Sequence, residues 1–295
     1  VPGSAIFAQD SGKLALLIPG LYGPGGLTVD SEARLPDGST HSAHFNSAFQ
    51  AEFTQFNIAL ASQLAAVPLP TPASGFTYTF DSSLGVFQRS TQSFGPILTE
   101  RAETIGKGKL TFGVTYQHFG FDTLEGLSLG DVPAVFTHDD AQLGGGRTDL
   151  VTTSNAIDAS VGQTVAFLSY GLGSRLDLSV AIPFVTVDLA AQSEAQVQRV
   201  GTATSPATHF YEDEAGGFGA LETYRASGHA SGIGDVIVRL KGTPVHNDSI
   251  AVALGVDGRI PTGDEEDLLG LGAFVALRAR SARRAAGLSA AASCR

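Results

Sequence analysis

Residues 109–121, K-L-T-F-G-V-T-Y-Q-H-F-G-F, decide the fold class of this chain. Large apolar side chains alternate with small or polar ones through this stretch. The apolar set is Leu110, Phe112, Val114 and Tyr116, and the small or polar set is Thr111, Gly113, Thr115 and Gln117. Because successive side chains of a strand point to opposite faces, the pattern predicts a β-strand with one apolar and one polar face. A small, polar inner face suits the wet lumen of a membrane barrel, whereas a soluble sandwich would turn the same face to bulk water.

Two further segments show the same alternation on both sides of a turn. The expected hairpins are Ala159–Tyr170 with Leu176–Leu189 around Gly171–Arg175, and Ile233–Lys241 with Ile250–Pro261 around 242–249. The expected strands are about 9–14 residues long, more than the roughly 5–6 of ordinary globular strands and close to the roughly 9–11 of bilayer-crossing strands. Pro183 interrupts its strand and predicts a bulge or the end of the pairing there.

Long polar stretches separate these hairpins. Asp122–Asp149 and Ala190–Ser231 are predicted to be long connections. Short turns at one end of the strands and long loops at the other are typical of outer-membrane barrels, and compact soluble domains seldom contain such long connections. On pattern alone a barrel is favoured over a sandwich.

The composition excludes several classes of protein. Gly is 36 of 295 residues, charged residues are 16% and hydrophobic residues 43%, which together indicate a folded, β-rich chain. The net charge is 18 − 29 = −11, so a phosphate-binding role is not expected and nucleic acid is excluded as a partner. Cys294 is the single cysteine, which rules out a disulfide scaffold. No apolar run reaches the roughly 18 residues of a membrane-spanning helix.

Motifs that carry chemistry are absent or weak. There is no G-x-S-x-G elbow and no complete phosphate loop. His41 and His44 are three residues apart but have no third metal ligand nearby, and the acidic run Gly263–Asp267 lacks the spacing of a calcium-binding hand. We therefore expect no enzyme activity, no cofactor and no metal site.

Polar residues on the strands are the candidate functional residues. A charge facing lipid near the middle of a bilayer costs about 2–4 kcal/mol for Arg, so the charged members should face inward or lie at the rim. The candidate lumen-lining residues are Thr111, Thr115, Gln117, Asp177, Ser179, Asp235, Arg239, Asp257 and Arg259. The alternative is that the charged ones form a salt-bridge network that only stiffens the barrel.

Several strings resemble a family of proteobacterial outer-membrane β-barrels labelled as transporters. The strings are His41–Phe49, Ala73–Asp81, Glu100–Gly108, Ser169–Pro183, Ala230–Lys241 and Arg259–Gly270. Some members of that family are linked to the degradation of phenol and other aromatics, and they are distantly similar to long-chain fatty-acid channels. The resemblance covers roughly residues 20–272 and implies fold more than substrate.

The residues and the resemblance together predict an organisation along the chain. Residues 1–8 are predicted from their sequence to be a signal-peptide remnant, with an ordinary flexible N-terminus as the alternative. Residues 9–56 are predicted to be an N-terminal arm or plug, and 57–272 the barrel strands with their loops. Residues 273–295 are rich in Ala and Arg and unlike anything upstream. They suggest either a basic helical tail or, since family members continue with further strands, a truncated or frameshifted end.

The expected fold is therefore all-β, an antiparallel transmembrane barrel, complete or incomplete. The expected function is an outer-membrane channel for passive uptake of small apolar or aromatic compounds. Its expected partners are outer-membrane lipid, the solute and the outer-membrane assembly machinery. Two alternatives remain: a non-transporting structural or adhesion barrel, and a soluble secreted β-protein that binds a ligand through its loops.

Overall fold

The structure is a computed structural model of the whole chain. It describes residues 5–7, 12–23, 26–31, 43–44, 58–59, 78–81, 86–89, 104–124, 126–139, 147–199, 209–212, 217–246, 250–272 and 275–285. Strands make up most of this part of the chain, and its one 3₁₀ turn is η1 (Leu14–Leu16). The all-β prediction is confirmed.

A nine-stranded sheet forms most of the molecule. Its strands are β1 (Ala5–Phe7), β6 (Leu110–Phe121), β9 (Val132–Asp139), β10 (Arg147–Gly173), β11 (Leu176–Arg199), β14 (Leu221–Ile233), β15 (Val236–His246), β16 (Ile250–Ile260) and β17 (Val275–Ala285). All pairings in it are antiparallel except that of β1, which runs parallel to β14. Apart from that one pair, the predicted antiparallel arrangement holds.

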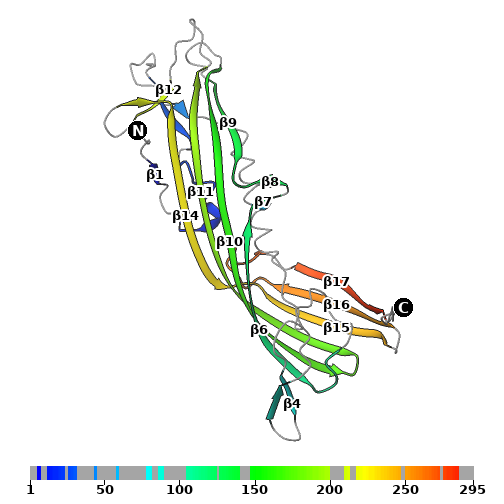
Figure 1. Cartoon of the computed structure of the whole chain (residues 1–295). Coiled ribbons are helices and arrows are strands. Elements are labelled where there is room, and N and C mark those ends of the chain that lie inside the picture. Colours follow the sequence, from blue (N-terminus) through cyan, green and yellow to red (C-terminus); the bar gives the residue numbers. More distant parts are fainter. Residues whose placement is uncertain are drawn as a thin grey trace, which may run out of the picture.

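The hairpin of β10 and β11 runs through the whole sheet (Figure 1). Its two strands have 27 and 24 residues, and the neighbour changes part-way along each, between Asn155 and Ala159 on β10 and between Ala181 and Phe184 on β11. Near the turn, β10 pairs with β6 and β11 with β15, which continues to β16 and β17. Farther from the turn, β10 pairs with β9 and β11 with β14. We call the part from the turn to the paired residues Gln163 and Val185 the lower half, and the rest of the hairpin with its neighbours the upper half.

Short strands accompany this sheet. They are β2 (Thr28–Ser31), β3 (Ala43–His44), β12 (His209–Glu212) and β13 (Phe218–Gly219) in one small sheet, and the hairpins β4 (Tyr78–Asp81) with β5 (Val86–Arg89) and β7 (Thr123–Leu124) with β8 (Leu127–Ser128). The sheet that contains β12 and β2 therefore joins segments far apart in the sequence.

The predicted long connections are wrong over much of their length. Within Ala190–Ser231, residues up to Arg199 continue β11 and residues from Leu221 belong to β14; within Asp122–Asp149, β7, β8, β9 and the start of β10 are present. Both stretches look loop-like in the sequence because their outward side chains are polar and many inward ones are small. The 9–14 residue estimate is accordingly wrong for β10 and β11 but agrees with β6, β15 and β16.

Pro183 neither ends its strand nor forms a bulge. It pairs with Val165 inside an uninterrupted register, and the register shift in this hairpin lies between Gly171 and Gly173. On its other side, the pairing of β11 with β15 extends to Ala181 and that with β14 begins at Phe184. Pro183 therefore lies where β11 exchanges one neighbour for the other, a position that needs fewer ladder hydrogen bonds.

The helical interpretation of the C-terminal segment is wrong for residues 275–285. This stretch forms β17, which pairs with β16 from Arg259↔Val275 to Ile250↔Ala285. Whether residues 273–295 are a frameshifted end stays a prediction, as do the proposed boundaries at residues 8 and 56.

The apolar core lies on the inner face of the upper half. It joins buried residues of β9, β10, β11 and β14 to an N-terminal segment, residues 12–23, which the structure places against that face. Leu14, Leu17, Ile18 and Leu21 of this segment are at most 6% exposed. The described part of the expected arm or plug thus packs inside the curved sheet.

Among the described strands, no pairing joins β6 to β17, so they do not form a closed barrel. No helix in the described part of the chain is long and apolar enough to cross a membrane.

Candidate functional site

One row of polar side chains crosses the lower half from strand to strand. The pairings Thr111↔Ser169, Ser169↔Ser179, Ser179↔Arg239 and Arg239↔Asp257 place these residues side by side on neighbouring strands. Thr111, Ser169 and Arg239 are buried, and the Ser169 and Ser179 hydroxyls are 2.7 Å apart. Four of the sequence-predicted candidates therefore lie in one continuous polar row.

An ion pair closes the described end of this row. Arg239 donates to both carboxylate oxygens of Asp257, from Nε at 2.6 Å and from Nη2 at 2.8 Å. The two side chains are only 9% and 15% exposed. Two parallel hydrogen bonds fix the guanidinium more rigidly than a single contact would, so this pair crosslinks β15 and β16.

Asp235 and Arg259 form a second, looser contact where β14 meets β15. Asp235 accepts backbone hydrogen bonds from Gly263 at 3.1 Å and Leu271 at 2.9 Å, and Arg259 Nη1 is 3.8 Å from its Oδ2. The Asp235 side chain is fully buried. Asp235, between β14 and β15, and Asp257 on β16 therefore both have cationic partners, the arrangement expected of a stiffening network.

The remaining candidates lie on the same inward side of their strands. Gln117 donates to Gln163 Oε1 at 2.5 Å, across the β6–β10 pair. Asp177 is 4% exposed and accepts from the Ile105 N–H at 3.0 Å. Within the described residues, Thr115 Oγ1 has no hydrogen-bond partner. All the candidate residues are buried or half-buried, and whether this side faces a lumen stays a prediction.

Sequence reasoning missed the β10 partners of these residues. Gln163 and Ser169 are 7% and 3% exposed and sit opposite Gln117 and Thr111. The sequence contained the signal for both residues. Side chains two positions apart share a face of a strand, so counting back from Asp177 in steps of two reaches Ser169 and Gln163 on the same face of β10.

An acidic loop holds the N-terminal segment in place. Lys13 Nζ lies 2.9 Å from Asp264, 3.0 Å from Asp267 and 3.6 Å from Glu266, and the Ala15 N–H donates to the Glu266 carbonyl at 2.8 Å. The hydrogen bond from Lys13 lowers the pKa of Asp264, while those to Asp264 and Asp267 raise the pKa of Lys13. The sequence shows an acidic run at Gly263–Asp267 without calcium-binding spacing, and the structure adds this tether.

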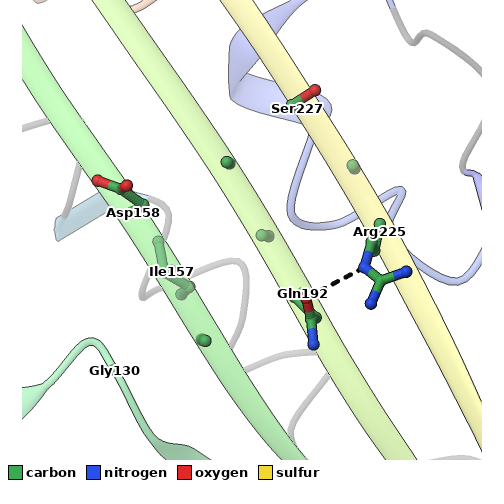
Figure 2. A pocket seen from close by; sticks show the side chains of 10 residues that line it. Gly130, Ile157, Asp158, Gln192, Arg225 and Ser227 are labelled. Carbon is green, nitrogen blue, oxygen red and sulfur yellow. Dashed lines mark hydrogen bonds between the residues drawn. The ribbon is translucent and has the colours of Figure 1, made fainter.

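A shallow groove of about 470 Å³ lies on the outer face of the upper half. Figure 2 shows Asp158, Gln192, Arg225 and Ser227 along it, with Arg225 Nε donating to Gln192 at 3.1 Å. Small side chains such as Ala156 and Ala190 form its floor. The groove is open, and its lining residues include no histidine or cysteine beside the Ser227 hydroxyl, so it suggests no reaction. Among the described residues, no group of three or more His, Cys, Asp or Glu is placed to hold a metal ion, and His41 lies outside them.

Fold and site together define an all-β protein with a mainly antiparallel sheet and a polar inner row. A family model described as "Putative MetA-pathway of phenol degradation" matches residues 137–272. That match covers the whole long hairpin together with β14, β15 and β16, and it ends at the residue where the resemblance seen in the sequence ends. It supports a relation to the phenol-degradation family, but it does not extend to residues 20–136. No curated protein and no solved structure matches the chain.

Proposed function

We propose that this chain is an outer-membrane channel for the passive uptake of small apolar or aromatic compounds. The relation to a phenol-degradation family supports a role in handling aromatic compounds. Passage through a channel requires no bond to be made or broken, so the proposal includes no reaction and no cofactor. It places the chain in the outer membrane after export, inserted by the outer-membrane assembly machinery and surrounded by lipid.

The observation that carries the proposal is an exposed apolar band around the outer face of the lower half. Val114 and Tyr116 are 63% and 71% exposed, whereas Thr111 on the opposite face of the same strand is 6% exposed. The band consists of Phe112, Val114, Tyr116, Leu168, Tyr170, Leu176, Leu178, Ile182, Phe184, Ile233, Leu240, Leu254 and Val256. A water-soluble protein rarely exposes so large an apolar surface, but lipid-facing strands require one.

The band has a sharp upper boundary. The cross-strand row Tyr116–Thr164–Phe184–Ile233 is largely apolar, and the next row on the same face, His118–Gly162–Thr186–Ser231, is not. From Leu176 to Phe184 the band is nine residues long on β11. Tilted membrane strands need roughly 9–11 residues, and aromatic residues concentrate at the edges of the apolar band. Tyr116 and Phe184 at this edge fit that pattern.

The rest of the lower half is compatible with a channel. The polar row and its ion pair lie on the face away from the band, and the hairpin turn at Ser174–Arg175 is short, as turns on the periplasmic side are. The net charge of −11 gives no reason to expect nucleic acid as a partner.

One observation favours a non-transporting barrel instead. The upper half is filled on its inner face by an apolar core, and residues 12–23 pack into it. A solute could pass only if this segment moved. A structural or adhesion barrel would have no need for such movement.

Reconstitution separates these candidates. The full chain is inserted into vesicles whose outer leaflet is lipopolysaccharide, and entry of a labelled aromatic solute is compared with entry into empty vesicles. A channel gives a faster, saturable entry rate, whereas an inserted chain without any rate increase supports a structural or adhesion barrel. A chain that stays in solution without detergent and does not associate with vesicles contradicts both and supports the soluble ligand-binding alternative.

A further inference from the structure

The side chain of Tyr22 reaches from the N-terminal segment onto the inner face of the upper half. Its hydroxyl donates to Asn155 Oδ1 at 3.0 Å and lies 2.9 Å from Ser193 Oγ. Since its one proton goes to Asn155, the Ser193 hydroxyl donates to the Tyr22 oxygen in return. The phenol group of this residue is thus bound through both its donor and its acceptor.

The surfaces around Tyr22 come from four strands of the sheet, β9, β10, β11 and β14. Asn155 of β10 and Ser193 of β11 are directly opposite each other, and Ser193 is opposite Tyr224 of β14. The Tyr22 ring meets Phe136 edge-on at 5.4 Å and 78°, and Tyr224 edge-on at 5.0 Å and 79°. Edge-to-face contacts of this kind add to simple apolar burial. We call the space bounded by these four wall residues the phenol slot.

The polar groups of the phenol slot are fixed by the wall itself. Asn155 and Ser193 are 1% and 0% exposed, within an otherwise apolar core. The Asn155 amide nitrogen donates to the Val132 carbonyl at 2.8 Å and to Thr153 Oγ1 at 3.0 Å. Those bonds hold the amide oxygen toward the Tyr22 hydroxyl. Buried polar groups are costly unless they are hydrogen-bonded, and here a phenolic hydroxyl satisfies them.

We propose that the phenol slot is a binding site for free phenols and that Tyr22 occupies it as a built-in ligand. The tyrosine side chain has the structure of p-cresol, so a phenol with a small para substituent would make the same contacts. Binding of such a phenol displaces Tyr22 and with it the segment 12–23, which opens the filled upper half. This inference rests on the proposed uptake of aromatic compounds and names phenols as the substrate class.

The first experiment measures what an emptied slot binds. Tyr22→Ala is prepared in detergent and titrated by calorimetry with p-cresol and with toluene, which has the same shape without the hydroxyl. We expect p-cresol to bind at least about tenfold more tightly, because toluene leaves Asn155 and Ser193 without a partner. Adding Asn155→Leu should reduce that preference several-fold. Equal affinity for p-cresol and toluene in Tyr22→Ala would overturn the proposal.

The second experiment uses the intact slot and does not depend on a cavity variant. Leu16 is 53% exposed on the N-terminal segment, so a nitroxide label on Leu16→Cys, in a Cys294→Ser background, reports whether the segment is held. Added p-cresol should convert an immobile spectrum to a mobile one. With Tyr22→Phe, which keeps the ring but loses the hydroxyl, release should need about five- to tenfold less p-cresol. A label that stays immobile at saturating p-cresol in both proteins contradicts displacement.

Neither measurement requires passage of solute. A chain that binds p-cresol and releases its segment but does not speed entry into vesicles would refute the proposed channel and leave the phenol slot standing. A chain that speeds entry of aromatics but does not distinguish p-cresol from toluene in binding would support the channel and refute the phenol slot.

Discussion

The upper and lower halves of the β10–β11 hairpin differ in polarity although they form one continuous ladder. On the outer face of β10, Ser154 and Asp158 of the upper half are exposed, and Leu168 and Tyr170 of the lower half are exposed too. The inner face of β10 mixes both kinds of residue throughout: Val151, Asn155 and Val161 are buried above, and Gln163, Val165, Phe167 and Ser169 are buried below. The geometry of a strand decides only which residues share a face. The surroundings decide which face is apolar, and the apolar outer face of the lower half alone is what the proposed position in a membrane requires.

The largest expected effect is on the ion pair of the lower half. Asp257→Ala leaves Arg239 as a buried charge without its main partner, which should lower the free energy of unfolding by about 3–5 kcal/mol. The matched control is Asp158→Ala, an exposed carboxylate of the upper half, where surface changes cost within about 0.5 kcal/mol. Denaturant unfolding of both variants in the same vesicles measures the difference.

A double variant sharpens this test. Arg239→Met with Asp257→Leu replaces both charges, and should recover most of the lost stability because no charge is left unpaired. If Asp257→Ala and Asp158→Ala cost the same, the polar row of the lower half is solvated like an ordinary surface.

A charge in the middle of the apolar band should have the next largest effect. Leu168 lies at the centre of the band on β10 and is 48% exposed, so a soluble protein would tolerate Arg there. In a bilayer, Leu168→Arg should cost about 2–4 kcal/mol. Ala156→Arg, on the same face of the same strand but in the upper half, should cost within about 0.5 kcal/mol. Similar costs for both in vesicle unfolding would argue against lipid around the lower half.

The interior of the upper half can be tested through its packing. A Cβ added at Gly228 would lie 2.6 Å from Leu14 Cδ2 and 3.1 Å from Leu17 Cδ1, so Gly228→Ala presses on the N-terminal segment. Overpacking of this kind costs about 1–3 kcal/mol. At Gly242 in the lower half, the nearest atoms would be 3.8 Å away, so Gly242→Ala should be nearly neutral. Thermal unfolding compares the two, and a neutral Gly228→Ala would mean that the segment is not docked in solution.

The lower half was the more predictable from sequence. Alternation in residues 109–121 is strong because its apolar side chains are large, so the strand and the side of each residue follow directly. The upper part of β11 was missed because its stretch A-A-Q-S-E-A-Q-V-Q, residues 190–198, has small inward residues and resembles a loop. Their pairing with β10 and β14 comes from the tertiary context, which outweighs local propensity.

The contacts of the N-terminal segment could not be predicted in the same way. Lys13 and its acidic partners are more than 250 residues apart in the sequence, and Tyr22 is 133 residues from Asn155. No periodicity connects such positions. Their meeting depends on the curvature of the sheet, which brings its inner face around the segment.

The smallest expected effect concerns the tether between Lys13 and the acidic loop. The pKa of Asp264 is lowered by its hydrogen bond with Lys13, so this contact stabilises the docked segment above the usual aspartate pKa and weakens as the pH falls through the lowered value. The raised pKa of Lys13 keeps the cation in place until well above the usual lysine range. The tether should therefore hold from about pH 4 to beyond about pH 10 and be lost outside that window.

Amide hydrogen exchange at Ala15, whose N–H bonds to Glu266, should speed up below about pH 4 once corrected for intrinsic rates. Lys13→Gln should exchange faster at neutral pH and show no such step. High salt should reduce the difference between the two proteins, because exposed charges are screened. A step of equal size in Lys13→Gln would mean that other carboxylates hold the segment.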